Sequence, residues 1–173
     1  MNNALIVIDM QKDFLSGSLS NSQADRVIAN VKSKIARYRD RQDEIIFTRD
    51  THGENYMQTQ EGKNLPVPHC IKNTDGWKIV DGFVENGDKI FDKPTFGSVE
   101  LAKYVQERGF ESVELVGVCT DICVVSNALL IKAFCPELPV SVDGECCAGV
   151  TEESHACALE TMASCQVKIQ NKK

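Results

Sequence analysis

Acid, amine and thiol side chains stand at the ends of three predicted strands. Asp9 follows the first apolar segment, Lys93 ends the third, and Cys123 follows the fourth. Because ligands of open α/β sheets bind at the carboxyl ends of the strands, we expect these groups to share one edge. Asp9 could take the thiol proton, and Lys93 could stabilise the thiolate. Each residue alone is typical of a structural position, but the three together favour nucleophilic catalysis.

Cys123 is the best nucleophile candidate among the eight cysteines. If Thr120 caps the following helix, Cys123 falls in its first turn, where unpaired N–H groups and the helix dipole favour a thiolate. Cys119 lies four residues earlier, so a redox pair of Cys119 and Cys123 is an alternative. The spacing is not that of a Cys-x-x-Cys motif, which makes the redox interpretation the weaker one.

Two kinds of apolar pattern indicate the elements that would position these groups. Short continuous apolar runs are typical of strands buried on both faces, and apolar residues three or four positions apart are typical of helices. We expect strands at 4–9, 44–50, 88–93, 112–118, 138–143 and 166–170, and helices from 24 after a Ser22 cap, at 99–108, at about 121–134 and at 151–164. This alternation favours an α/β fold, a doubly wound three-layer sandwich with a mostly parallel six-stranded sheet, in a single domain over 1–173.

Residues 51–76 form a long segment with no steady apolar period. Asp50 and His52 stand where it leaves the second predicted strand. Long loops are uncommon in compact domains unless they are functional. We therefore expect this loop to contribute to the site.

Composition excludes several classes of partner. The chain has 25 acidic and 19 basic residues, a net charge of −6, and no basic stripe that would follow phosphates, so we expect no nucleic acid partner. No segment approaches the roughly 18 apolar residues of a membrane span, so we expect no membrane association. The opening segment lacks a basic stretch and a cleavage site. We therefore expect a cytoplasmic protein with its cysteines as free thiols.

Three motifs of this chain resemble the signatures of the isochorismatase-like cysteine hydrolases, which include the nicotinamidases. They are ALIVIDMQKDF with Asp9, DKPTFGS with Lys93, and GVCTDICV ending in Cys123. The resemblance implies the isochorismatase-like hydrolase fold and an Asp–Lys–Cys triad in which Cys123 attacks an amide, an amine departs and a thioester is hydrolysed. It also implies a cis peptide bond between Val118 and Cys119 and an oxyanion hole made by the N–H groups of Cys119 and Cys123.

The long loop resembles the metal-binding segment of nicotinamidases. The segment TRDTHGENYMQTQEGKNLPVPHC would supply Asp50, His52, Glu61 and His69, with Glu54 as an alternative to Glu61. Mixed nitrogen and oxygen ligands suit one divalent metal, with Zn preferred and Fe or Mn as alternatives. Two of the three histidines fall in this loop, which favours the metal site over a solvated loop whose histidines cap turns.

The resemblance also suggests a substrate. It implies hydrolysis of nicotinamide to nicotinate and ammonia, as in NAD salvage, with Phe14 and Phe96 contacting the ring. The positions where nicotinamidases commonly carry a second aromatic residue are Pro66 and Val67 here. A related amidase for a carbamoyl or ureido-type small amide is therefore the alternative, together with an isochorismatase-like hydrolase of unassigned substrate.

Two further expectations concern assembly and a different function class. The resemblance implies a homo-oligomer, either a dimer or a tetramer. A non-catalytic nucleotide-binding α/β protein is another alternative, although the first turn, DMQKDFLSGS, has neither a GxGxxG nor a Walker pattern.

Overall fold

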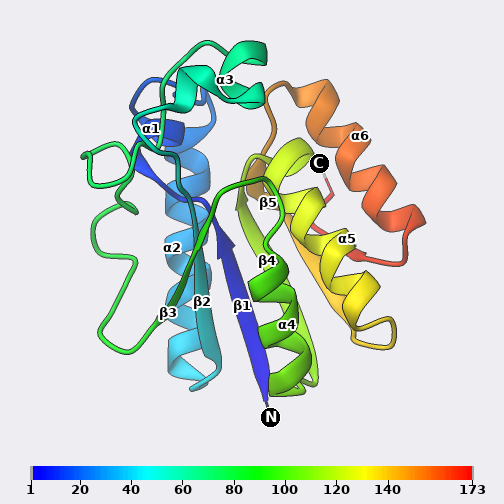
Figure 1. The fold of residues 1–173 in the computed structure, drawn as a ribbon. Helices are drawn as coiled ribbons and strands as arrows, with labels where there is room; N and C mark the ends of the chain where they lie inside the picture. Colours follow the sequence, from blue (N-terminus) through cyan, green and yellow to red (C-terminus); the bar gives the residue numbers. More distant parts are fainter. Residues whose placement is uncertain (1, 173) are drawn as a thin grey trace.

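A computed structural model describes residues 2–172, and its centre is a sheet of parallel strands (Figure 1). The sheet has six strands in the order β3-β2-β1-β4-β5-β6, and every described pairing is parallel. The strands are β1 (Asn3–Ile8), β2 (Glu44–Asp50), β3 (Lys89–Lys93), β4 (Ser112–Val118), β5 (Val140–Ala148) and β6 (Lys168–Gln170). The expected doubly wound parallel sheet is thus confirmed.

Helices cover both faces of the sheet and complete three layers (Figure 1). They are α1 (Lys12–Leu15), α2 (Ala24–Asp40), α3 (Gln60–Asn64), α4 (Val99–Arg108), α5 (Val125–Phe134) and α6 (Glu152–Ser164), with a 3-10 turn η1 (Tyr56–Gln58) and a π turn η2 (Thr120–Val124). None of the helices within residues 2–172 is long and apolar enough to cross a membrane.

Successive side chains of β1 point to opposite faces of the sheet and contribute to two hydrophobic cores. Leu5 and Val7 pack with α2 on one face, whereas Ala4, Ile6 and Ile8 pack with α4, α5 and α6 on the other. All five residues are inaccessible to solvent. A strand buried on both faces reads as one continuous apolar run, which is why the sequence identified β1.

Two predicted helix caps are wrong. The N-cap of α2 is Gln23 rather than Ser22, because Asn21 shapes this turn by accepting a hydrogen bond from the Gln23 N–H. Cys119, not Thr120, precedes η2. The Thr120 hydroxyl is instead hydrogen-bonded to a distant histidine, His155. Both cap predictions are therefore wrong because contacts of other side chains determine the local backbone geometry.

Two predicted boundaries also differ from the structure. Strand β5 continues to Ala148 instead of ending at 143, because its last residues pair with the end of β4 beyond a register shift. The predicted helix over 121–134 consists of η2 followed by α5. Within the expected long loop, η1 and α3 form a short helical segment that carries Glu61.

Gly117 brings the ends of β1 and β4 together beside the candidate site. Its φ is +119°, and a Cβ there would lie 2.1 Å from the carbonyl oxygen of Ile8. We expect Gly117→Ala to destabilise the fold by about 2–3 kcal/mol, because the methyl group overpacks a fixed backbone. Chemical denaturation measures this loss. Gly82→Ala, which replaces another positive-φ glycine with nothing within 4 Å, is the control for the cost of φ alone.

Candidate active site

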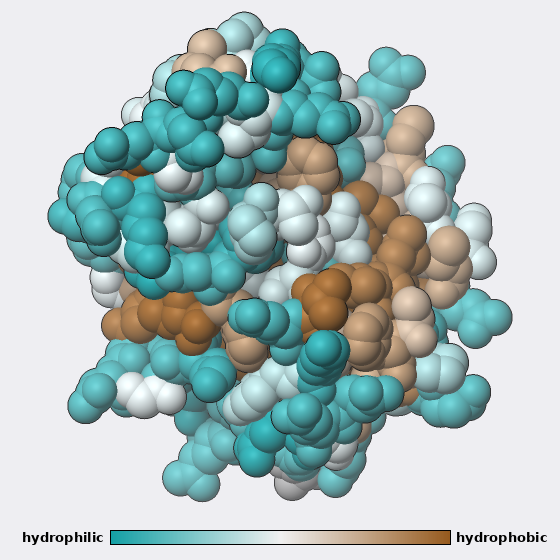
Figure 2. All heavy atoms as spheres, in the orientation of Figure 1, coloured by the Kyte–Doolittle hydropathy of each residue, from teal (hydrophilic) through white to brown (hydrophobic). Residues whose placement is uncertain are grey.

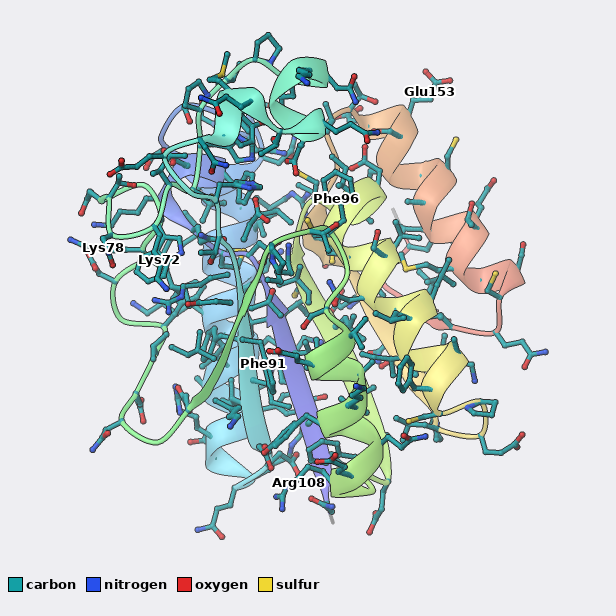
Figure 3. The ribbon with its side chains drawn as sticks, in the orientation of Figure 1. Lys72, Lys78, Phe91, Phe96, Arg108 and Glu153 are labelled. Carbon is teal, nitrogen blue, oxygen red and sulfur yellow. The ribbon has the colours of Figure 1, made fainter. Side chains whose placement is uncertain are left out.

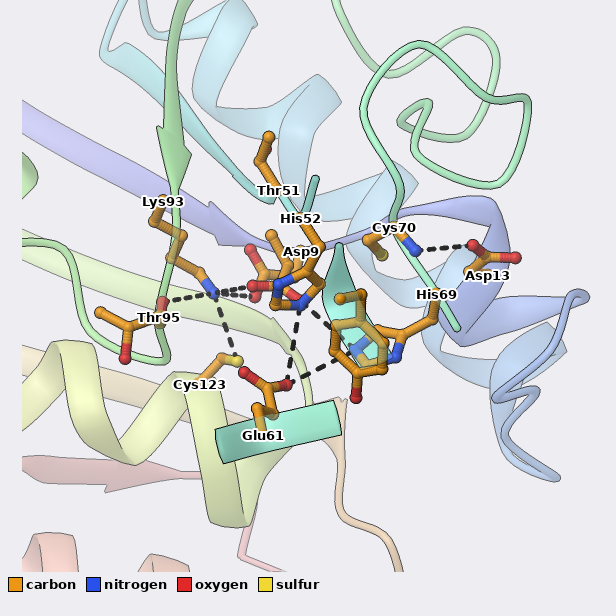
Figure 4. Close-up of polar contacts among 12 residues, drawn as sticks. Asp9, Asp13, Thr51, His52, Glu61, His69, Cys70, Lys93, Thr95 and Cys123 are labelled. Atoms are coloured by element: carbon orange, nitrogen blue, oxygen red, sulfur yellow. Dashed lines mark hydrogen bonds and ion pairs between the residues drawn. The ribbon is translucent and has the colours of Figure 1, made fainter. Parts of the chain in front are cut away.

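The three residues predicted as a triad meet at the carboxyl edge of the sheet (Figure 4). Lys93 Nζ lies 2.6 Å from Asp9 Oδ2 and 3.4 Å from Cys123 Sγ. All three side chains are buried. The strand order reverses between β1 and β4, so Asp9 and the turn that carries Cys123 stand at the point where α/β sheets bind ligands.

Asp9 is held in one orientation by its neighbours. Its Oδ1 accepts a hydrogen bond of 2.6 Å from the Thr48 hydroxyl, and its φ of 47° turns the chain away directly after β1. Apart from the ion pair with Lys93, no donor within residues 2–172 meets Oδ2 with hydrogen-bond geometry. Burial raises the pKa of Asp9, and Lys93 opposes this effect. Asp9 Oδ2 is therefore oriented to receive a proton.

Cys123 differs from the expectation that the helix start makes it a thiolate. Burial, and then the negative charge of Asp9, raise the pKa of this thiol well above its usual value despite the nearby Lys93. Although burial alone would favour the neutral amine, Asp9 and Cys123 raise the pKa of Lys93. The resting group is thus a neutral thiol beside a carboxylate–ammonium pair. Its proton must leave as the sulfur reacts.

The turn before the thiol has the geometry that the resemblance implies. The peptide bond between Val118 and Cys119 is cis, and Cys119 and Cys123 both line one cavity. Burial raises the pKa of the Cys119 thiol to about 12. The Cys119 side chain is therefore a neutral thiol at neutral pH.

The four residues predicted as metal ligands also gather, next to the triad (Figure 4). One ligand atom from each of Asp50, His52, Glu61 and His69 lies within 4.8 Å of all the others. Asp50 Oδ2 is 2.8 Å from His52 Nε2 and 3.5 Å from His69 Nε2. Asp50 Oδ1 is 3.4 Å from Lys93 Nζ, so one carboxylate contacts both groups of residues.

Contacts behind these ligands fix their orientation. The backbone N–H of Asp50 donates to the Gln11 side chain at 2.7 Å, and the Gln11 amide donates to the Asp50 carbonyl at 2.9 Å. His69 Nδ1 lies 2.8 Å from the carbonyl oxygen of Val67, which leaves Nε2 for a ligand role. Asp13 accepts a hydrogen bond from the N–H of Cys70, the residue that follows His69.

The donor set fits a divalent cation. Two imidazole nitrogens and two carboxylates provide mixed ligation with two negative charges. Burial raises the pKa of Asp50, but hydrogen bonds from His52 and His69 outweigh it and hold this pKa well below its usual range. The carboxylate is thus ionised, as a ligand must be. Glu54 is not in the group, so the structure places Glu61 there and not its alternative.

A single cavity of about 890 Å³ connects the two groups. Its walls include apolar side chains and the site residues, namely Phe14, Leu19, Asp50, Glu61, Leu65, His69, Phe96, Cys119, Ile122, Cys123 and Val150. Phe14 lies with its ring centre 5.5 Å from that of His69, and Phe96 stands 42% exposed on the opposite loop. Both predicted aromatic contacts therefore reach the cavity.

Several residues of the site were not identified from the sequence. The ring of Tyr56 packs 4.8 Å from His52 and 5.0 Å from His69, and its hydroxyl donates to the carbonyl of Leu65. Gln11 donates a hydrogen bond to the backbone of Asp50, and Thr48 donates one to the side chain of Asp9. In each pair the two residues are about 40 positions apart along the chain. No local pattern reveals such partners.

The fold and the site define an α/β enzyme with a thiol-bearing centre and a neighbouring group of metal-type ligands. This chain belongs to the isochorismatase family, because the model of the Isochorismatase domain matches residues 3–172. A solved pyrazinamidase of Pyrococcus horikoshii in complex with zinc is 31% identical, with a TM-score of 0.86 over 98% of both chains.

This chain is also similar to a further relative and to a further solved structure. The nicotinamidase/pyrazinamidase of Mycobacterium tuberculosis is 25% identical over 96% of this chain and 97% of that protein. The N-carbamoylsarcosine amidase of Thermoplasma acidophilum is 20% identical, covers 100% of this chain and 98% of its own, and has a TM-score of 0.81, which shows the shared fold alone. The similarity to nicotinamidases supports an amidohydrolase enzyme. The zinc-bound pyrazinamidase and the group of Asp50, His52, Glu61 and His69 support a divalent metal.

Proposed function

We propose that this protein is a cysteine-dependent amidohydrolase that converts nicotinamide to nicotinate and ammonia. One observation carries the proposal. Lys93 Nζ contacts Asp9, Cys123 and Asp50, so the triad and the metal-ligand group belong to one site. A nucleophile, a base and an electrophilic centre in one site are the parts that amide hydrolysis needs.

The reaction begins with the neutral Cys123 thiol. Its proton passes to Asp9 Oδ2 as the sulfur attacks the amide carbon, and Lys93 stabilises the charges of both groups. The N–H groups of Cys119 and Cys123 receive the oxyanion. Asp9 then gives the proton to the leaving nitrogen, ammonia departs, and an acyl thioester on Cys123 remains. Water, deprotonated by Asp9, hydrolyses this thioester to the acid and the free thiol.

Asp50, His52, Glu61 and His69 would hold the metal, which we propose is zinc. When bound, the metal would act as a Lewis acid that can bind a ring nitrogen and polarise water. The chain's own contribution is orientation. Phe14 stands beside His69, so a flat ring bound at this group would lie against an aromatic wall.

The charge of the cavity favours a neutral amide. Asp50 and Glu61 are its charged lining residues, and no Lys or Arg within residues 2–172 lines it. A substrate with a carboxylate, such as a carbamoyl amino acid, would find no basic side chain in the walls to pair with. A neutral heteroaromatic amide suits the apolar walls without such a partner.

A second candidate is an amidase for a carbamoyl or ureido-type small amide. It is favoured by Pro66 and Val67, which stand where nicotinamidases commonly carry a second aromatic residue. A cavity of about 890 Å³ also accepts amides larger than nicotinamide.

Ammonia release by the zinc-loaded protein distinguishes the two candidates. We expect kcat/KM for nicotinamide to exceed that for N-carbamoylglycine by at least about 100-fold, because nicotinamide has a ring to pack against Phe14 and Phe96 and no described Lys or Arg of the walls pairs with the carboxylate of N-carbamoylglycine. Intact-protein mass spectrometry should detect the nicotinoyl adduct during turnover. The reverse order of substrates would establish the second candidate, and hydrolysis of neither amide would contradict both.

A further inference from the structure

The segment between β3 and α4, residues 94–98, forms one wall of the cavity. It follows Lys93, and its Thr95 and Phe96 line the cavity. Figure 3 shows Phe96 on this segment, above the start of α5. The Phe96 ring is 42% exposed, so packing alone does not hold it in place. The position of the ring depends on what fixes the backbone of the segment.

Asn127, on α5, fixes that backbone. Its side chain is 1% exposed and lies one helical turn after Cys123. The amide Nδ2 donates to the carbonyl of Phe96 at 3.0 Å and to the carbonyl of Cys123 at 2.8 Å. The amide oxygen accepts from the N–H of Ser98 at 2.9 Å. Both ends of the amide are thus used, and two of its three bonds go to the 94–98 segment.

The remaining contacts of the segment are weaker or belong to the triad. Lys93 Nζ donates to the carbonyl of Thr95 at 3.2 Å, and a Cβ on Gly97 would only touch Leu130 and Ser126 at ordinary van der Waals distance. Ser98 uses its own side chain to cap α4 by accepting from Leu101. Asn127 is therefore the side chain that ties the Phe96 backbone to the helix following Cys123.

We propose that Asn127 is a positioning residue that determines specificity by holding the Phe96 ring in the wall of the cavity that Cys123 also lines. This inference rests on the proposed function for its substrate but concerns a residue that takes no part in the proposed chemistry. Asn127 is not among the residues that line the cavity, and it contacts Cys123 at the backbone carbonyl and not at the thiol. It acts on the Phe96 ring through the backbone of Phe96. Its effect falls on amides with a flat ring, since only these gain from a fixed aromatic wall.

A double-mutant cycle tests this route. We expect Asn127→Leu, which keeps the size but removes the hydrogen bonds, to raise KM for nicotinamide about fivefold with kcat changed less than about twofold. Phe96→Ala should raise KM by a similar factor. In the Phe96→Ala background, Asn127→Leu should have no further effect on KM, because the two residues act as one unit. KM for propionamide, which has no ring, should be unchanged.

A second measurement does not depend on activity. The chain contains one tryptophan, Trp77, so an indole introduced by Phe96→Trp can be followed after subtracting the wild-type signal. We expect Asn127→Leu to raise acrylamide quenching of this new indole about twofold, because a released backbone moves more. Asn30→Leu, which removes a side-chain hydrogen bond to the Glu145 carbonyl on another part of the sheet, is the matched control and should leave the quenching unchanged.

The outcomes separate the inference from the proposed function. If nicotinamide is not hydrolysed but quenching rises as expected, the function fails and the positioning role stands. Independent, additive effects of Asn127→Leu and Phe96→Ala on KM, or quenching that does not change, would overturn the positioning role. Should Asn127→Leu not fold, Asn127→Asp keeps the acceptor for Ser98 and loses both donated bonds. It should raise the quenching similarly, and unchanged quenching in this variant would also overturn the inference.

Discussion

Replacing Cys123 with alanine is expected to lower kcat/KM for nicotinamide by about 10⁴-fold or more, to the background of the assay. The reason is chemical, because alanine has no electron pair to attack the amide carbon and no thioester can form. Cys123 is buried and packs against the core, so loss of the sulfur also leaves a small cavity. Ammonia release measures the activity, and circular dichroism with a thermal melt verifies the fold.

Cys119→Ala is the matched control for this loss. It removes the second thiol of the same turn but keeps the backbone N–H proposed to bind the oxyanion. We expect this variant to retain a measurable part of the activity. If both variants lost activity alike, a redox pair of Cys119 and Cys123 would become the better interpretation. Full activity in Cys123→Ala would remove the proposed nucleophile.

The triad could be predicted because it depends on strand ends. Asp9, Lys93 and Cys123 follow or end short apolar runs, and a parallel sheet brings the carboxyl ends of its strands to one edge. The structure places all three together, which the spacing along the chain cannot show. The metal-ligand group could be predicted only from the resemblance to nicotinamidases, since Glu61 and His69 lie in a segment without a periodic apolar pattern. Their positions depend on α3 and on the contact between Asp13 and Cys70.

What could not be predicted depends on burial and on distant partners. The thiolate expected for Cys123 is wrong, because burial and then the negative charge of Asp9 raise the pKa of this thiol despite Lys93. Neither burial nor the proximity of a charge is visible in the local sequence. Thr120 was interpreted as a cap, yet it is buried against His155, which lies 35 residues later. Tertiary contacts determine the roles of such residues, and the spacing of residues along the sequence does not reveal these contacts.

Removing the divalent metal is expected to produce the second large effect. Chelation should lower kcat/KM for nicotinamide by about 10³-fold, because several kcal/mol of charge stabilisation would be lost. Zinc should restore the activity, and titration of the stripped protein by calorimetry should give one site per chain. Asp50 would keep its contacts with Lys93, 3.4 Å away, and with His52, 2.8 Å away. Full activity after complete metal removal would contradict a catalytic role for the metal.

The ligand set itself is tested by comparing two histidines. His69→Ala removes one of the four grouped donors, and we expect it to weaken zinc binding by at least about 100-fold, beyond the loss typical of a residue that only supports a ligand. His155→Ala removes a histidine that lies outside the group, bonded to Thr120, and should leave zinc affinity unchanged. Metal content by mass spectrometry and calorimetric affinity both report this difference without requiring turnover. Equal zinc affinity in the two variants would show that the metal binds elsewhere, because His69, unlike His155, presents its Nε2 to Asp50 and Glu61.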